Sequence, residues 1–178
     1  MLGAPPSGNY MNIREEKASD IEKIWKLNSQ VFGTATEANL VNTLRECGCT
    51  YVSLVAETED KIVGHILFTP VELIGSKSNV KIMGLAPMAV QTEYQNKGIG
   101  SLLVLAGLDR CRALGYDAVV VLGHPGYYPR FGFLPSASFG VKSEYEVPEG
   151  VFMVMELVPG SLKDQRGVIK YHAAFSSV

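Results

Sequence analysis

Residues 95–100 (QNKGIG) place two closely spaced glycines shortly after the apolar segment 85–90. Because Gly98 and Gly100 lack a Cβ atom, successive backbone N–H groups can approach an anion closely. A long helical pattern begins at Gly98, and the amino end of a helix carries about half a positive charge. This spacing indicates a site for a phosphate or pyrophosphate group.

Two other phosphate-binding motifs do not fit this segment. The dinucleotide fingerprint GxGxxG requires a third glycine, and that position holds Leu103. The P-loop pattern, GxxxxGK followed by Ser or Thr, occurs nowhere in the chain. A site for NAD or ATP is therefore not favoured. A tight turn between a strand and a helix would by itself also explain the two glycines.

A second motif, residues 127–133 (YYPRFGF), follows about 30 residues later and places Tyr128 four residues before Gly132. Together with the pattern Q-x-x-G-x-G at 95–100, it resembles the motifs of the GCN5-related N-acetyltransferases, the GNAT family. The resemblance covers roughly residues 12–157. The sequence around Tyr128 and in the tail, at Tyr171, is similar to that of a bacterial subfamily.

The resemblance implies an α+β fold: a single domain with a mixed, mostly antiparallel sheet, a splayed pair of parallel strands and flanking helices. It also implies acetyl-CoA as cosubstrate and no metal. Pantetheine would lie along residues 88–90, since Pro87 has no N–H to donate. The pyrophosphate would lie on the amides that follow, with charge from Lys97 or Arg112. The residues expected to bind acetyl-CoA are Met88, Ala89, Val90, Gln95, Asn96, Lys97, Gly98, Ile99, Gly100 and Ser101.

Tyr128 occupies the position of the family's tyrosine, which implies that its phenol protonates the thiolate leaving group. General acid catalysis of this kind contributes about 10²-fold or more to a rate. In an aromatic cluster, however, any one ring can equally belong to the core. We expect Tyr128 to be the acid, Tyr127 to pack in the cluster, and Arg130 to form a structural pair.

Glu37 and His124 are the two candidates for the general base that deprotonates the acceptor amine. Glu37 lies on the inward stripe of the second helix, which in the family borders the acceptor cleft; alternatively, it complements the helix dipole and bonds to Thr34. His124 follows a buried strand, and imidazoles exchange protons near neutral pH, but a structural role in a turn is the alternative. His65, inside a strand, is expected to be packed or solvated.

The periodicity of apolar residues predicts the elements that position these groups. The unit at 80–122 is predicted to be strand–helix–strand with parallel strands and a right-handed crossover. Its helix carries few charges, so we expect it to be covered on most sides. Pro70 predicts a bend or an edge in its strand. Strands are expected at 12–15, 51–57, 61–74, 80–90, 118–122, 139–143, 152–157 and 168–172, and helices from about 20 to 32, at 36–46 and at 98–114.

The composition agrees with one globular domain. The chain has 178 residues, of which 47% are apolar and 19% charged, and a formal net charge of -2. Since there is no basic excess, nucleic acid is not expected as a partner. There is also no apolar run of about 18 residues for a membrane span. We expect a flexible leader at 1–11 and a domain at 12–178, in which 158–178 is a C-terminal extension that packs on the rest.

The three cysteines predict neither a disulfide framework nor a zinc site, because their number is odd and no CxxC spacing occurs. Free thiols in a reducing compartment are the expectation. The first ten residues also lack the basic and apolar regions of a secretion signal. Together these features predict a cytoplasmic protein.

These observations lead to two functional hypotheses. The first is an acetyl-CoA-dependent N-acetyltransferase that transfers an acetyl group to a primary amine by direct attack in a ternary complex, without an activated Cys or Ser. The second is a non-catalytic acyl-CoA-binding or sensor module with the same fold. The acceptor would be a small-molecule or peptide amine, and the protein a monomer or homodimer. Determinants of the acceptor are expected in the first two helices, around Pro70 and at 134–150.

Overall fold

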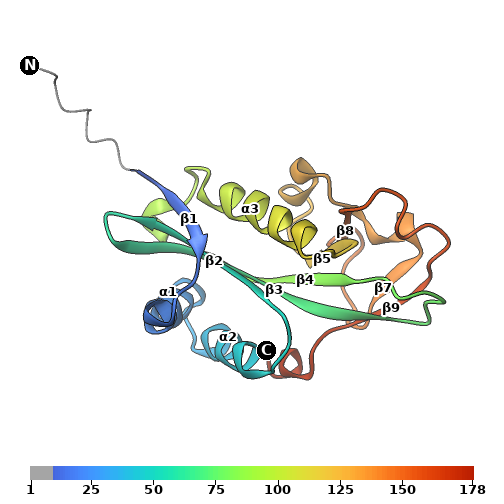
Figure 1. Cartoon of the computed structure of the whole chain (residues 1–178), viewed down its shortest axis with the longest axis horizontal. Coiled ribbons are helices and arrows are strands. Elements are labelled where there is room, and N and C mark those ends of the chain that lie inside the picture. The colour runs from blue at the N-terminus through green and yellow to red at the C-terminus, as the bar shows by residue number, and fades with distance from the viewer. Residues whose placement is uncertain (1–9) are drawn as a thin grey trace, which may run out of the picture.

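A central sheet divides the protein, with α3 on one face and α1 and α2 on the other (Figure 1). The computed structural model describes residues 10–178. The strands are β1 (Asn12–Glu15), β2 (Val52–Thr58), β3 (Lys61–Ile74), β4 (Ile82–Val90), β5 (Ala118–Leu122), β6 (Leu134–Pro135), β7 (Val141–Ser143), β8 (Phe152–Glu156) and β9 (Gly167–Lys170). The helices are α1 (Ile21–Phe32), α2 (Thr36–Glu46) and α3 (Ile99–Ala113), with short 3₁₀ helices between elements.

The main sheet has the order β1-β2-β3-β4-β5-β8-β6. Its neighbouring strands are antiparallel except for β4 and β5, which α3 connects as a parallel pair. Beyond the main sheet, β9 pairs with the end of β3, and β7 pairs in parallel with β9. This arrangement confirms the predicted fold class, a mixed and mostly antiparallel sheet with a splayed parallel pair and flanking helices.

Pro70 lies in β3 where the strand changes partners. On one side, pairing with β2 ends at Phe68, and pairing with β9 begins only at Glu72. On the other side, Pro70 stands opposite Met83 of β4. A proline is tolerated here because its missing N–H faces the interval between two ladders. The strand thus continues through Pro70. The edge expected there corresponds to the short stretch of β3 that is paired with neither β2 nor β9.

The parallel pair of β4 and β5 separates after three residue pairs. The last of these joins Gly84 to Val120, whereas β4 continues to Val90. On its other side β4 remains paired with β3, with a register shift between Ile66 and Phe68. The backbone of residues 85–90 is therefore open on the side that faces away from β3.

Two apolar layers hold the helices on the sheet. On one face, α3 buries Ile99, Leu103, Val104, Leu108 and Cys111 in the core that it shares with the strands. On the same helix, Leu102 is 47% exposed and Leu105 is 50% exposed. The expectation that α3 is covered on most sides is therefore wrong, because one stripe of apolar residues already provides the contact with the sheet. On the other face, α1 and α2 bury Ile24, Leu40, Val41 and Leu44.

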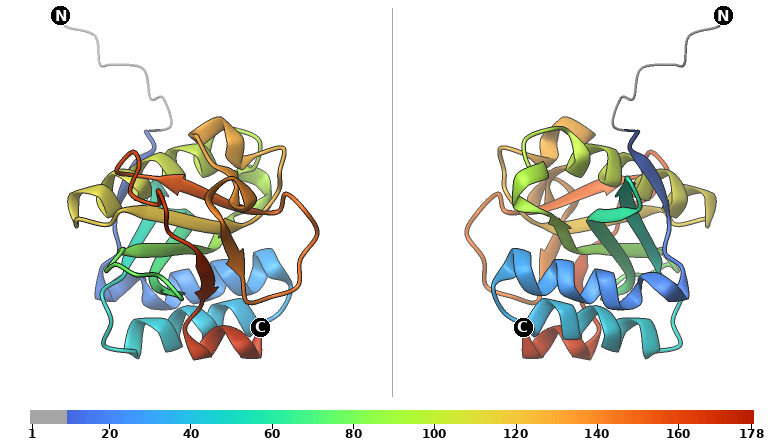
Figure 2. Two further views of the ribbon diagram at one scale, coloured as in Figure 1. Left: turned by 90° about the vertical axis from the view of Figure 1, so that its right-hand side faces the viewer. Right: turned by 90° about the vertical axis from the view of Figure 1, so that its left-hand side faces the viewer.

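The C-terminal segment lies against the same face as α2. Its last 3₁₀ helix, Ala173–Ser177, runs beside α2 in both views of Figure 2. Phe175 contacts the buried clusters there. Of the predicted leader at 1–11, residues 1–9 lie outside the described part of the chain, whereas the side chain of Met11 packs partly buried against the core.

Cys47 and Cys49 form a disulfide at the end of α2, and Cys111 is a buried free thiol. The expectation of free thiols throughout the chain is therefore wrong for this pair, whose spacing of two residues matches no common disulfide framework. Within residues 10–178, no helix is both long and apolar enough to cross a bilayer.

Candidate active site

The loop between β4 and α3 forms a cradle at the amino end of the helix. Gly98 adopts the left-handed conformation, with φ of 84°, and α3 begins at the next residue. The side-chain amide of Gln95 donates to the carbonyl of Val90 at 2.8 Å, which ties the loop back to the end of β4. The first N–H groups of a helix have no partner within the helix. They are therefore available to an anion at this end of α3.

A pocket of about 560 Å³ lies over this cradle. It contains eight of the ten residues expected to bind acetyl-CoA; the other two, Ala89 and Lys97, are not in its wall. Ala89 is buried opposite His65, and Lys97 places its ammonium 5.5 Å from the ring centre of Tyr94. The lining residues are Val31, Met88, Val90, Tyr94, Gln95, Asn96, Gly98, Ile99, Gly100, Ser101, Tyr127 and Arg130.

Tyr127 forms part of the pocket wall, although the sequence predicted only a packing role. Its hydroxyl oxygen lies 3.3 Å from Oγ of Ser101 in the first turn of α3. A Cβ atom at Gly100 would lie 2.9 Å from the same hydroxyl oxygen, so the absence of a side chain permits this approach. The ring also packs edge-on against Tyr128 and Phe131. Two adjacent tyrosines in one motif gave no signal of which ring faces the pocket.

Tyr128 is buried within the aromatic cluster, with 8% of its surface exposed. Its ring packs edge-on against Phe133 and Tyr127, with ring centres 5.5 Å and 5.1 Å apart. It is not in the pocket wall but directly behind Tyr127. Burial, with a smaller contribution from Tyr127, raises the pKa of the Tyr128 phenol to about 12. The phenol is therefore protonated throughout the neutral range and can donate a hydrogen bond.

The two candidate bases lie outside the pocket wall. Glu37, in the first turn of α2, accepts a hydrogen bond of 3.1 Å from the hydroxyl of Thr34. His124 lies exposed in the turn after β5, where its carbonyl accepts the N–H of Tyr127 at 3.0 Å. For Glu37, the observed contact is the one named as its structural alternative.

His65 is fully buried in a chain of polar side chains between α1 and the sheet. Its Nε2 lies 2.9 Å from Oγ of Ser53, and its Nδ1 lies 3.2 Å from Nδ2 of Asn28. The backbone carbonyl of Ser53 accepts the N–H of Glu16 at 3.1 Å, and the carboxylate of Glu16 is paired with Arg45 at 2.8 Å. Burial lowers the pKa of His65 to about 4, so the imidazole is neutral. This confirms the packed alternative for His65.

Two further cationic side chains, Arg112 and Arg130, lie in different places. Arg112 is in the last turn of α3 and pairs with Asp109 at 2.8 Å, far from the cradle. Arg130, expected to form a structural pair, lies in the pocket wall with its guanidinium carbon 4.4 Å from the ring centre of Tyr127. Among residues 10–178, no group of three or more His, Cys, Asp or Glu side chains is placed to hold a metal ion.

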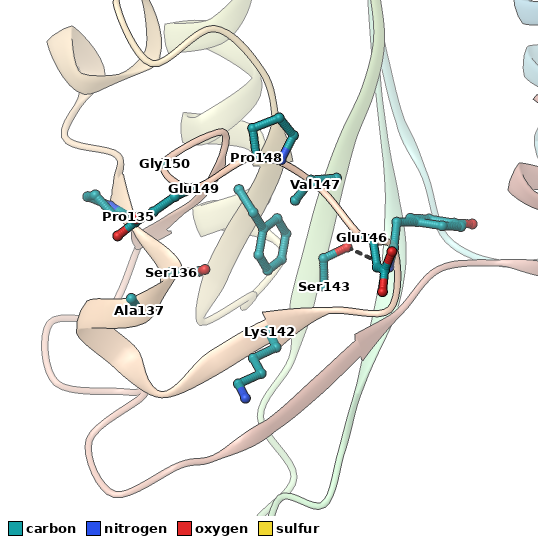
Figure 3. A pocket seen from close by; sticks show the side chains of 12 residues that line it. Pro135, Ser136, Ala137, Lys142, Ser143, Glu146, Val147, Pro148, Glu149 and Gly150 are labelled. Carbon is teal, nitrogen blue, oxygen red and sulfur yellow. Dashed lines mark hydrogen bonds between the residues drawn. The ribbon is translucent and has the colours of Figure 1, made fainter.

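A second pocket of about 410 Å³ opens beside β7 and the segment that leads to β8. Figure 3 shows Val147 and Pro148 on one side of it and Ser136 and Ala137 on the other. Its charged residues are Lys142, Glu146 and Glu149. The pocket falls within the segment 134–150, where determinants of the acceptor were expected.

The chain is similar to known acetyltransferases over most of its length. Residues 12–135 match the model of an acetyltransferase (GNAT) domain. The chain is 36% identical over 167 residues to the "Uncharacterized N-acetyltransferase YhbS" of Escherichia coli K12, a match that covers 93% of this chain and 99% of the relative. It is 41% identical over 134 residues to the "Uncharacterized N-acetyltransferase YjhQ" of the same organism, covering 74% of each.

Two solved structures have the same fold. The crystal structure of E. coli YhbS in complex with CoA superimposes with a TM-score of 0.91 at 33% identity, and the match covers 98% of this chain and 96% of that one. A GNAT-family acetyltransferase from Brucella melitensis in complex with acetyl-CoA has a TM-score of 0.77 at 31% identity and covers 94% of this chain and 99% of its own.

Proposed function

The chain belongs to the GNAT family of N-acetyltransferases, and we propose that it transfers the acetyl group of acetyl-CoA to a primary amine by direct attack in a ternary complex. The observation that carries this proposal is a single arrangement. The open backbone of β4 beyond Gly84 leads into the pocket at the amino end of α3. A long ligand with amides at one end and phosphates at the other fits that arrangement.

Acetyl-CoA would use both parts of the arrangement. Its pyrophosphate would accept hydrogen bonds from the free N–H groups at the start of α3, where the helix dipole favours negative charge. Its pantetheine amides would bond to the open backbone of β4. The proposed binding residues are Met88, Ala89, Val90, Gln95, Asn96, Lys97, Gly98, Ile99, Gly100 and Ser101, with Ala89 acting through its backbone and Lys97 through its charge.

Tyr128 is proposed as the general acid for the departing thiolate. When the amine attacks the thioester carbon, the C–N bond forms and the C–S bond breaks, which leaves negative charge on sulfur. A phenol with a pKa of about 12 remains protonated and donates a hydrogen bond to that charge. Since an ordinary thiol has a pKa of about 8.5, complete transfer from the phenol must be coupled to reprotonation from the amine side.

The amine must lose a proton before it attacks, and Glu37 and His124 remain the proposed acceptors of that proton. Both have side chains that reach solvent. Neither is in the pocket wall, so transfer would pass through water. Replacing each in turn, Glu37→Gln and His124→Asn, separates them. The variant that lacks the general base should lose the acidic limb of the pH profile of kcat, while the other variant should keep it.

A free-thiol assay with acetyl-CoA and a panel of amines tests the transfer. We expect thiol release with at least one amine, and a fall in kcat of about 100-fold in Tyr128→Phe at nearly unchanged acetyl-CoA affinity. Tyr127→Phe is the matched comparison, since it removes the adjacent hydroxyl. A larger loss of kcat in Tyr127→Phe than in Tyr128→Phe would contradict the acid assignment. Binding of acetyl-CoA without thiol release for any amine would favour the sensor module instead.

We also propose the class of acceptor, the compartment and the oligomeric state. The acceptor is a small-molecule or peptide amine that enters beside the second pocket, whose rim carries Glu146 and Glu149. The protein is proposed to act in the cytoplasm, as a monomer or homodimer. Size-exclusion chromatography with light scattering distinguishes these two states.

A further inference from the structure

The pocket at the amino end of α3 has a second wall, which comes from the chain after β5. This wall contains Tyr127 and Arg130, at the start and near the end of the short 3₁₀ helix Tyr128–Phe131. The cradle at Gly98 and Gly100 supplies the facing wall. The two walls touch where the hydroxyl of Tyr127 lies 3.3 Å from Oγ of Ser101.

The guanidinium of Arg130 is held in place by neutral groups. Its Nε donates to the carbonyl of Tyr127 at 2.9 Å, and Nη2 donates to the carbonyl of Gly126 at 3.4 Å. Its plane also lies over the Tyr127 ring, with 4.4 Å between the guanidinium carbon and the ring centre. These contacts fix the position of the group without using its charge.

Four of the other five arginines of the chain are paired with carboxylates; Arg166, which lines a different pocket, has no ion pair among residues 10–178. Arg14, Arg45, Arg110 and Arg112 each contact an Asp or Glu side chain. Within residues 10–178, no carboxylate lies within ion-pair distance of Arg130. An oriented guanidinium with free N–H groups and no counter-charge, in a pocket wall, is suited to bind an anion in a forked geometry.

We propose that Arg130 binds a phosphate group of CoA from the side of the pocket opposite the α3 cradle, with Tyr127 as the support that positions its guanidinium. This inference rests on the proposed function, because it takes CoA as the ligand of this pocket. Two phosphate sources are chemically equivalent here, the pyrophosphate and the 3′-phosphate of CoA. Arg130 would add to the backbone amides a full positive charge in the pocket wall itself, where Lys97 does not lie.

Calorimetric titrations with three probes test the proposal: CoA, dephospho-CoA, which lacks the 3′-phosphate, and pantetheine, which lacks every phosphate. The variants are Arg130→Gln and, as a matched control, Arg112→Gln. Both remove one positive charge from an exposed arginine. Arg112 lies about 20 Å along α3 from the cradle at 1.5 Å per residue.

We expect Arg130→Gln to weaken CoA binding by about 10- to 100-fold, as for loss of a charge-assisted hydrogen bond, and to leave pantetheine binding unchanged. Arg112→Gln should change CoA affinity by less than about twofold. If dephospho-CoA loses as much affinity as CoA in Arg130→Gln, the group bound is the pyrophosphate. If only CoA loses affinity, it is the 3′-phosphate. Either pattern supports the proposal.

Three results would overturn it: equal losses in Arg130→Gln and Arg112→Gln, equal losses for CoA and pantetheine, or no loss in Arg130→Gln. The variant Arg130→Lys adds a further constraint, because an ammonium keeps the charge but not the fork. We expect it to recover only part of the CoA affinity that Arg130→Gln loses. A wild-type chain that binds none of the three probes would overturn the proposed function as well, which distinguishes the two failures.

Discussion

The side-chain amide of Asn28 determines which nitrogen of His65 carries the proton. Nδ2 of Asn28 donates to the carbonyl of Ile24 at 3.0 Å and also lies 3.2 Å from Nδ1 of His65. The first contact fixes the orientation of the amide, so Nδ1 of His65 must accept. Nε2 therefore carries the hydrogen and donates to Ser53. A histidine in this state cannot take a proton from Ser53, so the contact is structural rather than a nucleophile and its base.

This arrangement predicts a loss of stability in mildly acidic solution. The pKa of His65 is about 4 in the folded chain and near 6.5 when unfolded, because burial disfavours the charged form. Between these values only the unfolded chain binds the proton, so stability falls as the pH drops through that window, by on the order of 3 kcal/mol in total. Urea denaturation at pH 7.5 and 5.0 measures this.

The variant His65→Gln serves as the control for that measurement. It removes the titrating group, and its stability should change much less between the two pH values. Arg14 lowers the pKa of Asp20. Burial raises the pKa of Glu16, but its contact with Arg45 outweighs burial and lowers it. Both carboxylates therefore affect stability only below about pH 4.5. Equal pH dependence in wild type and His65→Gln would refute the assignment to His65.

The ion pair between Arg14 of β1 and Asp20, which precedes α1, should contribute more to stability than a surface pair on α1. Asp20 is 2% exposed and accepts hydrogen bonds from both terminal nitrogens of Arg14 and from the N–H of Lys17. We expect Asp20→Asn to lower the free energy of unfolding by about 2 kcal/mol. The comparison variant, Glu22→Gln, breaks an exposed pair with Lys26 and should leave the denaturation midpoint nearly unchanged. Similar losses in both variants would contradict this ranking.

Two glycine variants separate stability from ligand binding at the cradle. Gly98 has a φ of 84° with open space around it, so Gly98→Ala should cost about 1 kcal/mol of stability through backbone strain. Gly100 lies within the helix and has no such strain, but a Cβ atom there would contact the Tyr127 hydroxyl at 2.9 Å. Gly100→Ala should therefore displace the Tyr127 hydroxyl and weaken CoA binding by about tenfold. The melting temperature should change little, because Ala favours the helix over Gly and offsets the displacement. Calorimetric titration of both variants with CoA checks this. If Gly100→Ala binds CoA as tightly as the wild type, the prediction is wrong.

The disulfide between Cys47 and Cys49 should contribute little to global stability. It closes a loop of only three residues, and the entropic stabilisation from a cross-link decreases with loop length. We expect a mild thiol reductant to release two reactive thiols, counted with Ellman's reagent, and to lower the melting temperature by only a few degrees. Cys111 is the internal control, since it is fully buried and burial raises its pKa to about 12. Labelling of Cys111 in the folded protein would contradict its burial.

Much of the fold could be predicted from local patterns. The bounds of β3, β5 and α2 agree with the prediction, because each is a strongly patterned segment between turn residues. β6 has only two residues and depends on a partner far away in the sequence, so local patterns carry little information about it. The strand predicted at 139–143 is confirmed only at 141–143, because Phe139 ends a short 3₁₀ helix. The Cys47–Cys49 disulfide was missed for a different reason, since it follows no recognised spacing.

At the candidate site, glycine chemistry and motif spacing identified the cradle but not the wall that faces it. Gly98 and Gly100 could be interpreted from backbone geometry alone. Tyr127 and Arg130 reach the pocket only because the chain after β5 returns to α3, which no local pattern encodes. For the same reason, the sequence could not distinguish Arg112, at the far end of the helix, from a cation beside the pocket.

Calorimetric titration of the wild-type chain with acetyl-CoA, repeated with Gly100→Ala, tests whether the pocket at the amino end of α3 binds this cosubstrate. We expect one site per chain and a clear loss of affinity in the variant at a nearly unchanged melting temperature. Absence of acetyl-CoA binding to the folded wild type, or equal binding to both proteins, would contradict it.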